Sequence, residues 1–102
     1  MKFQNMELTV HNAGAFQDGS PCIELYCEDG PYARISFCAN DGENVFPASK
    51  DCIWLKDWSE NEEIARFLLD ENYLELTGKR IPQAFVVYKE ARITTKLKQI
   101  MK

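Results

Sequence analysis

The sequence has no long apolar run, no internal repeat and no low-complexity linker. No segment approaches the roughly 20 consecutive apolar residues of a transmembrane helix, and the first residues lack the apolar stretch of a secretion signal. There is also no Asn-x-Ser/Thr glycosylation acceptor. These absences predict a cytoplasmic protein that does not associate with membranes.

The motifs of common catalytic sites are missing as well. Neither Gly-x-Ser-x-Gly nor His-Glu-x-x-His occurs, and the stretch Gly78-Lys79-Arg80 lacks the first glycine and the Ser/Thr of a phosphate-binding loop. His11 is the only histidine, and its place near the end of a predicted strand favours an exposed polar role. We therefore predict no enzymatic activity, no catalytic residue and no cofactor.

The spacing of the cysteines does not suit a metal site. The four cysteines are Cys22, Cys27, Cys38 and Cys52. Structural zinc sites usually have ligand pairs about two to four residues apart on a turn, whereas Cys22 and Cys27 are five apart on one predicted strand and point to opposite faces. We predict no metal. Whether Cys22 and Cys38 pair across a hairpin is left open, since reduced thiols are expected in the cytoplasm.

The composition is that of one ordinary globular domain. The 102 residues are 45% hydrophobic and 27% charged, which argues against disorder, collagen-like repeats and coiled coils. A chain of this length forms a single domain, residues 1–102, that buries about two thirds of its unfolded surface. The formal net charge of −4 is too small for a DNA mimic and has the wrong sign for a general nucleic-acid-binding protein.

Charge is distributed unevenly along the chain. Residues 57–75 contain seven acids and one base, whereas residues 79–102 contain seven bases and one acid. This division fits either a dipolar surface that docks a partner or two solvated faces, and we prefer the second interpretation. The basic third nevertheless supports nucleic-acid binding as an alternative function. Its candidate contacts are Lys79, Arg80, Lys89, Arg92, Lys96 and Lys98.

The best-marked element is a helix within residues 58–72. Ser59 and Glu62 have the spacing of a capping box, in which each side chain accepts from the backbone N–H of the other, worth about 1 kcal/mol. Trp58, just before the cap, can pack back on the first turn. An apolar face at helical spacing is made by Ile64, Phe67, Leu68 and Leu69. The helix therefore needs an apolar surface to cover.

A β-hairpin is the clearest strand signal. Residues 22–28 and 32–38 alternate between apolar and polar on either side of residues 29–31. A three-residue loop places Leu25 opposite Ile35 on one apolar face. A two-residue loop would set apolar against polar positions and require the proline of the loop to pair. We therefore predict the three-residue loop.

Other alternating segments complete the predicted fold. Residues 39–51 lack periodicity and form either a long loop or a second short hairpin. Asn72 suits the left-handed end of the helix, and residues 78–82 suit a turn. The tail from Thr94 is compatible with a short amphipathic helix that has no cap. Further strands are predicted at residues 3–10, 52–55, 73–77 and 84–88, the last in the sheet interior because it is apolar on both faces.

The predicted fold is therefore α+β: a mainly antiparallel sheet of about five to six strands, with one capped helix packed across it and room for a short C-terminal helix. Without a catalytic set, we expect the protein to act by binding another protein. Tryptophan and tyrosine often anchor interfaces, and strand edges can accept a partner strand, although core packing explains the aromatic residues equally well. The candidate partner-binding residues are Tyr26, Tyr32, Trp54 and Trp58.

Several short segments follow one another in a characteristic order between residues 22 and 93. They are residues 31–36, residues 58–62 at the start of the helix, Phe67-Leu68 within it, Thr77-Gly78, and residues 84–88. Their order and spacing resemble a family of small proteins, without assigned activity, that plasmids and conjugative elements of gut bacteria encode. The resemblance implies an accessory role in a mobile element, which includes inhibition of a host or rival defence protein by direct binding. It supplies no catalytic motif.

Overall fold

Nine short strands and two α-helices make up the computed structural model, which describes all 102 residues. The α+β class is confirmed, but the strands form three antiparallel sheets where one sheet of five to six strands was predicted. The first sheet pairs β1 (Lys2–Phe3) with β2 (Met6–Glu7). The second has the order β3 (Thr9–Ala15), β4 (Pro21–Cys27), β5 (Gly30–Arg34), and the third β6 (Ser36–Phe37), β7 (Cys52–Leu55), β9 (Val87–Ile93), β8 (Leu74–Pro82).

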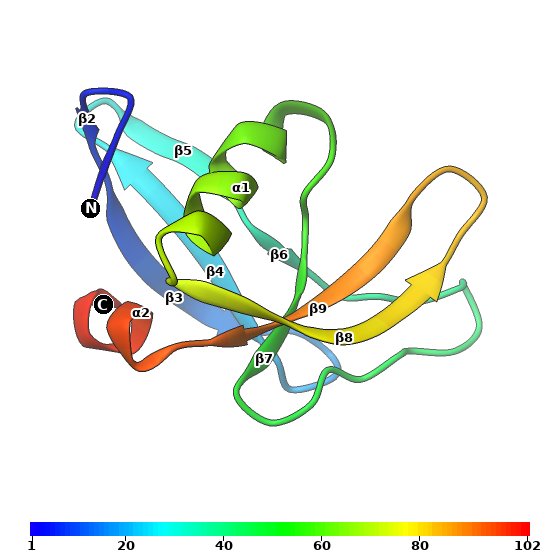
Figure 1. Cartoon of the computed structure of the whole chain (residues 1–102). Helices are drawn as coiled ribbons and strands as arrows, with labels where there is room; N and C mark the ends of the chain where they lie inside the picture. Colours follow the sequence, from blue (N-terminus) through cyan, green and yellow to red (C-terminus); the bar gives the residue numbers. More distant parts are fainter.

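The helix α1 (Glu62–Asp70) lies across the space between the second sheet and the β8–β9 hairpin (Figure 1). A short 3₁₀ turn, η1 (Ser59–Asn61), leads into it, and the second helix, α2 (Thr95–Ile100), packs beside β3 near the opposite end from the hairpin tip. Both larger sheets and both helices contribute to one apolar core. Neither helix has the length and apolarity needed to cross a membrane.

The apolar face predicted for the helix is buried in this core. Ile64 and Leu68 of α1 are almost inaccessible, while Phe67 and Leu69 are partly buried at its edges. Full burial of a side chain of this size stabilises the fold by about 1.5–3 kcal/mol. The helix ends at Asp70, and the left-handed conformation predicted for Asn72 just beyond it is confirmed by a φ of 62°.

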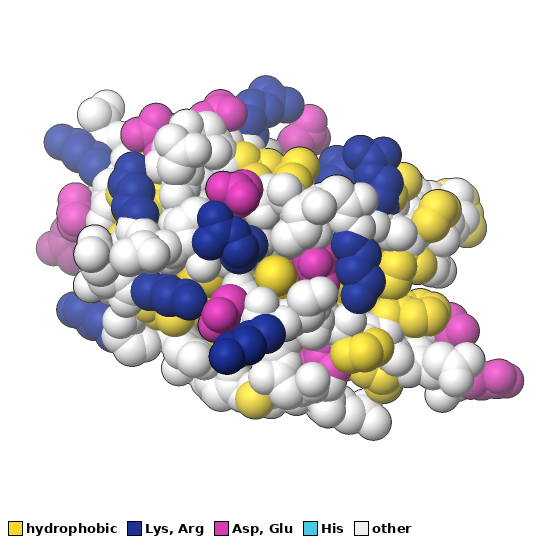
Figure 2. Space-filling view, turned by 60° about the horizontal axis from the view of Figure 1, so that its bottom comes forward, with side chains coloured by type: hydrophobic (Ala, Val, Ile, Leu, Met, Phe, Trp, Pro, Cys, Tyr) yellow, Lys and Arg dark blue, Asp and Glu magenta, His cyan; other side chains and the backbone are white.

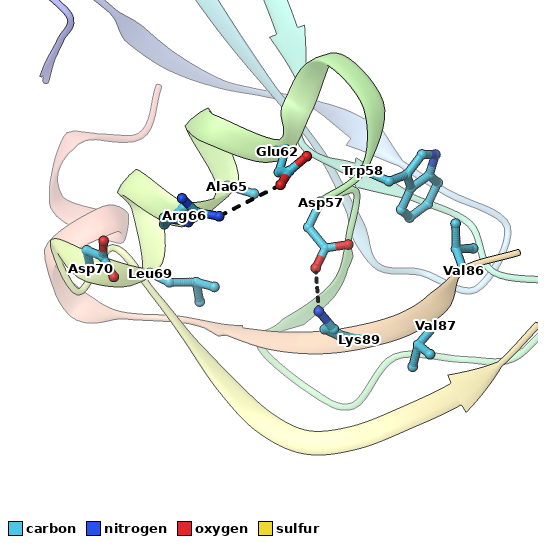
Figure 3. A pocket seen from close by; sticks show the side chains of 10 residues that line it. All are labelled: Asp57, Trp58, Glu62, Ala65, Arg66, Leu69, Asp70, Val86, Val87 and Lys89. Atoms are coloured by element: carbon cyan, nitrogen blue, oxygen red, sulfur yellow. Dashed lines mark hydrogen bonds and ion pairs between the residues drawn. The ribbon is translucent and has the colours of Figure 1, made fainter.

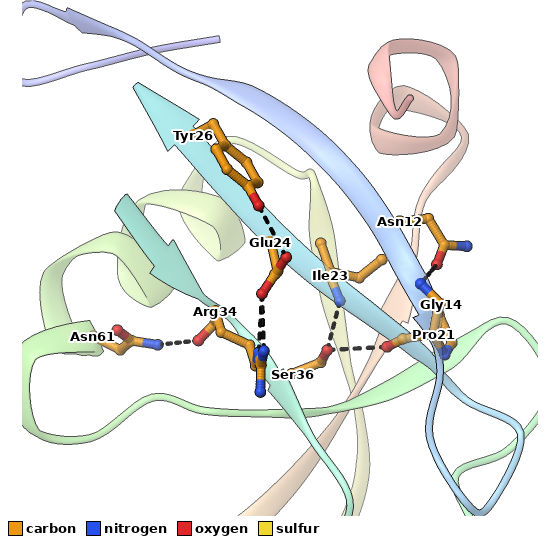
Figure 4. A network of polar contacts seen from close by, with 9 residues as sticks. All are labelled: Asn12, Gly14, Pro21, Ile23, Glu24, Tyr26, Arg34, Ser36 and Asn61. Atoms are coloured by element: carbon orange, nitrogen blue, oxygen red, sulfur yellow. Dashed lines mark hydrogen bonds and ion pairs between the residues drawn. The ribbon is translucent and has the colours of Figure 1, made fainter. Parts of the chain in front are cut away.

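The chain passes from the second sheet to the third at Ile35. Its backbone N–H donates to Ile23 in β4 (3.0 Å), while its carbonyl accepts from Lys56 just after β7 (2.9 Å). At the next residue, the Ser36 side chain takes the place of a backbone partner for β4. Its hydroxyl accepts a hydrogen bond from the Ile23 N–H (2.8 Å) and donates one to the Pro21 carbonyl (3.0 Å) (Figure 4). These bonds let one extended segment serve two sheets, which the alternation of residues alone does not show.

The β4–β5 hairpin is confirmed, but its predicted three-residue loop and register are wrong. The loop has two residues, 28 and 29, and Leu25 pairs with Ala33 instead of Ile35. Pro31 pairs with Tyr26, and a bulge at Tyr32 restores the inward orientation beyond it. Because β5 lies at the edge of its sheet, a proline without an N–H is tolerated there.

The predicted strand at residues 3–10 is divided. Gln4 and Asn5 have φ values of 49° and 63° and turn the chain back, so that β1 and β2 form a small hairpin before β3 begins. Leu8 and Val10 are nevertheless buried, as their alternation predicted. Asparagine tolerates the left-handed conformation better than most residues, and the turn contains no glycine or proline that would have marked it.

The last third of the chain also differs from prediction. Residues 78–82, predicted as a turn, continue β8 through a bulge at Gly78, whose φ is 93°. The predicted interior strand at 84–88 is instead mostly the turn of the hairpin, and the interior position belongs to β9. The helix α2 does have a cap, because the Thr94 hydroxyl accepts from the Leu97 N–H (3.3 Å).

Residues 39–51 form a long irregular loop with one tight turn. A single bridge joins Asn40 to Val45, so the segment combines both predicted alternatives without becoming a regular hairpin. The Asp41 carboxylate accepts from the backbone N–H groups of Asn44 (2.6 Å) and Glu43 (2.9 Å), and these bonds hold the pKa of Asp41 below its ordinary value.

Candidate protein interface

The tip of the β8–β9 hairpin carries the most exposed large hydrophobic side chain in the protein. The turn, residues 83–86, contains Phe85, which is 98% exposed, and Val87 at the start of β9 is also exposed. One backbone hydrogen bond closes the turn, from the Gln83 N–H to the Val86 carbonyl (2.9 Å). Figure 2 shows hydrophobic side chains gathered at the right-hand end of the molecule, where this hairpin lies. The apolar surface of Phe85 is therefore available to another molecule.

Three aromatic rings support the hairpin behind its tip. Trp58 stacks on Tyr88 of β9, with 6.0 Å between ring centroids. Phe37 of β6 meets both rings edge-on, at 5.1 Å from Trp58 and 4.8 Å from Tyr88. Such pairs contribute about 0.5–1.5 kcal/mol beyond the burial of their area. All three side chains are half-buried, so they hold the hairpin and still present aromatic surface beside it.

A groove of about 440 Å³ lies between α1 and this hairpin. Trp58, Val86 and Val87 line one side, and Leu69 lies beneath the helix on the other (Figure 3). The volume falls within the range of about 300–1,000 Å³ that binding sites commonly have. Because the apolar wall continues into the hairpin tip, we treat groove and tip as one surface, the hairpin–helix face, defined by Trp58, Leu69, Phe85, Val86 and Val87.

Two ion pairs stand in the groove. The Lys89 ammonium donates to the Asp57 carboxylate at 3.0 Å, which joins β9 to the segment before the helix, and Arg66 pairs with Glu62 along α1 at 3.7 Å (Figure 3). Asp70 lines the far end of the groove and has no ion-pair partner. The groove therefore has an apolar end at the hairpin and an acidic end at Asp70.

Asn61 positions the start of α1 against both larger sheets. Its side-chain amide is buried and donates to the carbonyls of Arg34 (2.7 Å) and Lys56 (3.2 Å); the first of these bonds is drawn in Figure 4. Loss of this amide would leave two carbonyls unpaired, at a cost of about 1–3 kcal/mol for each one that stays dry. The polar anchor explains why a helix with a weak N-terminus still has a fixed place.

The predicted capping box is wrong. Ser59 has a φ of 58°, a left-handed conformation, whereas an N-cap residue needs extended backbone. The α-helix begins only at Glu62, and neither η1 nor α1 has a side-chain cap. Glu60 instead pairs with Lys56 at 3.2 Å, and its own backbone N–H together with that ammonium lowers the pKa of Glu60. Trp58 packs on the hairpin rings described above.

Of the two tryptophans predicted to contact a partner, only Trp58 lies on the hairpin–helix face. Trp54 has an exposed fraction of 0%, and its indole N–H donates to the Phe46 carbonyl (2.8 Å). This burial contradicts the prediction that Trp54 contacts a partner. Its ring anchors the loop of residues 39–51 instead.

The two predicted tyrosines lie on the second sheet, and neither lines the groove. The Tyr26 hydroxyl donates to the Glu24 carboxylate (3.3 Å), which also accepts from the Arg34 guanidinium (3.0 Å) (Figure 4). The negative charge of Glu24 raises the pKa of Tyr26. Tyr32 is 39% exposed, lies edge-on to Phe3 at 6.3 Å, and lines a separate hollow beside η1. Contact of either tyrosine with a partner stays a prediction.

Most of the predicted nucleic-acid contacts are engaged within the protein. Four of the six bases form ion pairs: Lys79 with Glu90 (3.8 Å), Lys89 with Asp57 (3.0 Å), Arg92 with Glu75 (3.0 Å) and Lys98 with Asp51 (3.3 Å). Lys96 donates to the Glu71 carbonyl and lies over the Tyr73 ring, so Arg80 alone has neither kind of contact. Figure 2 shows bases interspersed with acids. A phosphate backbone would have to compete with these carboxylates.

The cysteines and the histidine are not brought together. All four thiols are free, so Cys22 and Cys38 are not joined, and burial raises the pKa of Cys52. No group of three or more His, Cys, Asp or Glu side chains is arranged to hold a metal ion. His11 shares a hydrogen bond with the Thr9 hydroxyl (3.0 Å).

The sequence interpretation did not place Phe85, Val86 and Val87 in a protein interface, because residues apolar on both faces indicate an interior strand. One signal pointed elsewhere. Pro82 has no backbone N–H and cannot sit within a central strand, so the chain was bound to turn or reach an edge close to it. The apolar run that follows such a proline is well placed for the tip of a hairpin.

No protein-family model matches the chain, and neither a curated protein nor a solved structure matches it. The resemblance to small proteins of plasmids and conjugative elements therefore stays a prediction.

Proposed function

We propose that the protein acts by binding another protein through the hairpin–helix face, without bond-making chemistry. The observation that carries the proposal is the 98% exposure of Phe85 beside a groove that Trp58, Val86 and Val87 line. Large apolar side chains on a projecting turn are the usual anchors of an interface, and a half-buried aromatic cluster behind them supplies a rigid support.

The energetic balance of the tip favours this role. Phe85 contributes no buried area to the fold, and keeping its ring in water forgoes about 1.5–3 kcal/mol that burial would supply. A partner that covered Phe85 and filled the groove would recover that free energy as affinity. The resemblance to proteins of mobile elements implies that this partner is a defence protein, and we include that identity in the proposal.

Photo-crosslinking tests the proposal directly. Phe85 is replaced by p-benzoylphenylalanine in the full chain, and lysate of the native cells is irradiated in its presence. We expect a discrete crosslinked protein that disappears when Val86→Ser and Val87→Ser are added. The matched control carries the photo-crosslinker at Ile100, which is also an exposed apolar residue but lies on α2 at the other end of the molecule. Equal crosslinking from both positions, or none from position 85, would contradict the proposal.

Nucleic-acid binding is the weaker alternative. Of its six candidate bases, only Arg80 has a side chain that forms no ion pair or hydrogen bond within the protein. A mobility-shift assay at low salt checks it, since the phosphate contribution is strongest there. A shift that Arg80→Ala removes would support this alternative over protein binding.

A further inference from the structure

We infer that the occupant of the hairpin–helix face is a basic protein segment with one apolar anchor, an inference that rests on the proposed function. Three hollows lie along the exposed side of α1, and the charged residues that line them are six acids and two bases. The acids are Asp57, Glu60, Glu62, Glu63, Asp70 and Glu71, and the bases are Arg66 and Lys89.

Internal ion pairs neutralise only part of this charge. Asp57, Glu60 and Glu62 each pair with a cation. Glu63 accepts a hydrogen bond from the neutral Gln4 amide (2.7 Å), and Asp70 has no ion-pair partner. Glu71 also forms no ion pair, so three of the six carboxylates are uncompensated: Asp70 in the groove itself, and Glu63 and Glu71 in the neighbouring hollows. A lysine or arginine of a partner would complement this negative charge.

The arrangement also sets a spacing for the partner. In Figure 3 the apolar wall of Trp58 and Val86 lies at one end of the groove and Asp70 at the other. Glu62 and Asp70, at the two ends of α1, are eight residues apart, which corresponds to about 12 Å along a helix. An extended partner segment covers this distance with about four residues, and a helical one with about eight. In Figure 3, Trp58 and Val86 lie beyond Glu62 as seen from Asp70, so the apolar anchor and the base of the segment should be at least this far apart.

A random peptide library tests both the charge and the spacing. Twelve-residue peptides displayed on phage are selected on the full chain and counter-selected on a Val86→Ser, Val87→Ser variant, which retains the groove's acids. We expect the recovered peptides to contain a large apolar residue with Lys or Arg at least about four positions away. A synthesised peptide of this kind should bind several-fold more weakly when its bases are replaced by Gln.

Charge reversal on the protein gives the reciprocal test. Asp70→Lys should weaken binding of the same peptide by about 3- to 10-fold and remove most of its salt dependence. The variant should remain folded, because a lysine in the last turn of a helix is favoured by the helix dipole. Glu43→Lys is the matched control: Glu43 is exposed and lines none of the three hollows, so it should leave the affinity unchanged.

The outcomes separate this inference from the proposed function. Acidic or neutral peptides that still require Val86 and Val87 would overturn the basic occupant and leave protein binding at this face intact. Recovery of no peptide that distinguishes the chain from the Val86→Ser, Val87→Ser variant would overturn both. Sedimentation that shows a concentration-dependent dimer, lost in Phe85→Ser, would identify a second copy as the occupant and overturn the basic segment.

Discussion

Two loops lie at the same end of the molecule and are held in opposite ways: residues 39–51 and the hairpin turn at residues 83–86 (Figure 1). The first is long, polar and irregular, yet side chains from other parts of the fold hold it. The second is short and apolar, and a single backbone bond closes it. Length and polarity would suggest that the first loop is the mobile, functional one. The contacts indicate the reverse.

Four contacts with side chains elsewhere in the fold hold residues 39–51. The Ala48 N–H donates to the Asp18 carboxylate (3.0 Å) and the Ser49 N–H to the Glu90 carboxylate (2.8 Å). The carbonyls of this loop accept from the Trp54 indole (2.8 Å) and from the Lys79 ammonium (3.3 Å). No comparable contact fixes the ring of Phe85. The polar loop therefore serves the stability of the fold, while the apolar turn is free to serve binding.

Glu90→Ala should have the largest effect on stability. Glu90 is 2% exposed. Its carboxylate accepts hydrogen bonds from the Ser49 N–H and the Thr77 hydroxyl, both at 2.8 Å. Its removal leaves these donors without a partner, so we expect the free energy of unfolding to fall by about 2–3 kcal/mol. Urea denaturation measures it, with Phe85→Ala as the control. A smaller loss of stability than in the control would contradict the claim that the loop of residues 39–51 stabilises the fold more than the hairpin turn does.

Acid should weaken the first loop in the same way. Burial by itself would raise the pKa of Glu90, but the hydrogen bonds from Ser49 and Thr77 and the Lys79 ammonium outweigh it, so the pKa lies below its ordinary value. For Asp18 too, burial is outweighed by the bonds from Ser20 and Ala48. A depressed carboxyl pKa contributes stability that is complete above the unfolded pKa and is lost as pH falls through the folded one.

The expected outcome is therefore a free energy of unfolding that is constant near neutral pH and falls below about pH 4.5, the ordinary pKa of glutamate. Urea denaturation at pH values between about 2.5 and 7 checks this. Glu90→Gln should flatten the profile, since it cannot titrate. An equally steep profile in Glu90→Gln would show that other carboxylates control the acid response.

The elements that could be predicted from sequence are those with local causes. The helix was predicted from the spacing of Ile64 and Leu68, and the strand at residues 52–55 from four consecutive apolar residues. The left-handed conformation at Asn72 could be predicted from that residue alone, because asparagine is one of the few residues that adopt it readily after a helix. In each case the physical cause lies within a few residues of its effect.

The elements that were missed depend on distant partners. The β4–β5 register follows from Ile35, which bonds to both sheets, and from a bulge that costs little on an edge strand. The capping-box motif at Ser59 was present, but the buried Asn61 amide fixes the chain so that Ser59 takes a left-handed conformation. On the candidate interface, Trp58 was predicted, whereas Phe85 was not, because its exposure depends on where the hairpin turns and only Pro82 signals that turn.

Ser59→Gly distinguishes the motif from the geometry by the sign of a smaller effect. At a φ of 58°, a serine is strained where glycine is not, so we expect the free energy of unfolding to rise by about 0.5–1 kcal/mol. A working capping box would predict no gain at all, because the side-chain oxygen would be lost. Ser49→Gly, at another exposed serine without a positive φ, is the control and should give no such gain. A decrease in stability for Ser59→Gly would support the capping-box interpretation instead.

Phe85→Ser should have the smallest effect on stability and the largest on binding. Because the ring is 98% exposed, its loss removes almost no buried area, and we expect the free energy of unfolding to change by less than about 0.5 kcal/mol. Loss of an anchoring aromatic residue should at the same time weaken partner binding by about 2 kcal/mol or more, roughly 30-fold. Denaturation of the variant together with titration of a peptide selected on the full chain measures both quantities. A variant that unfolds more easily would show that the tip supports the fold after all, and the contrast between the two loops would then be lost.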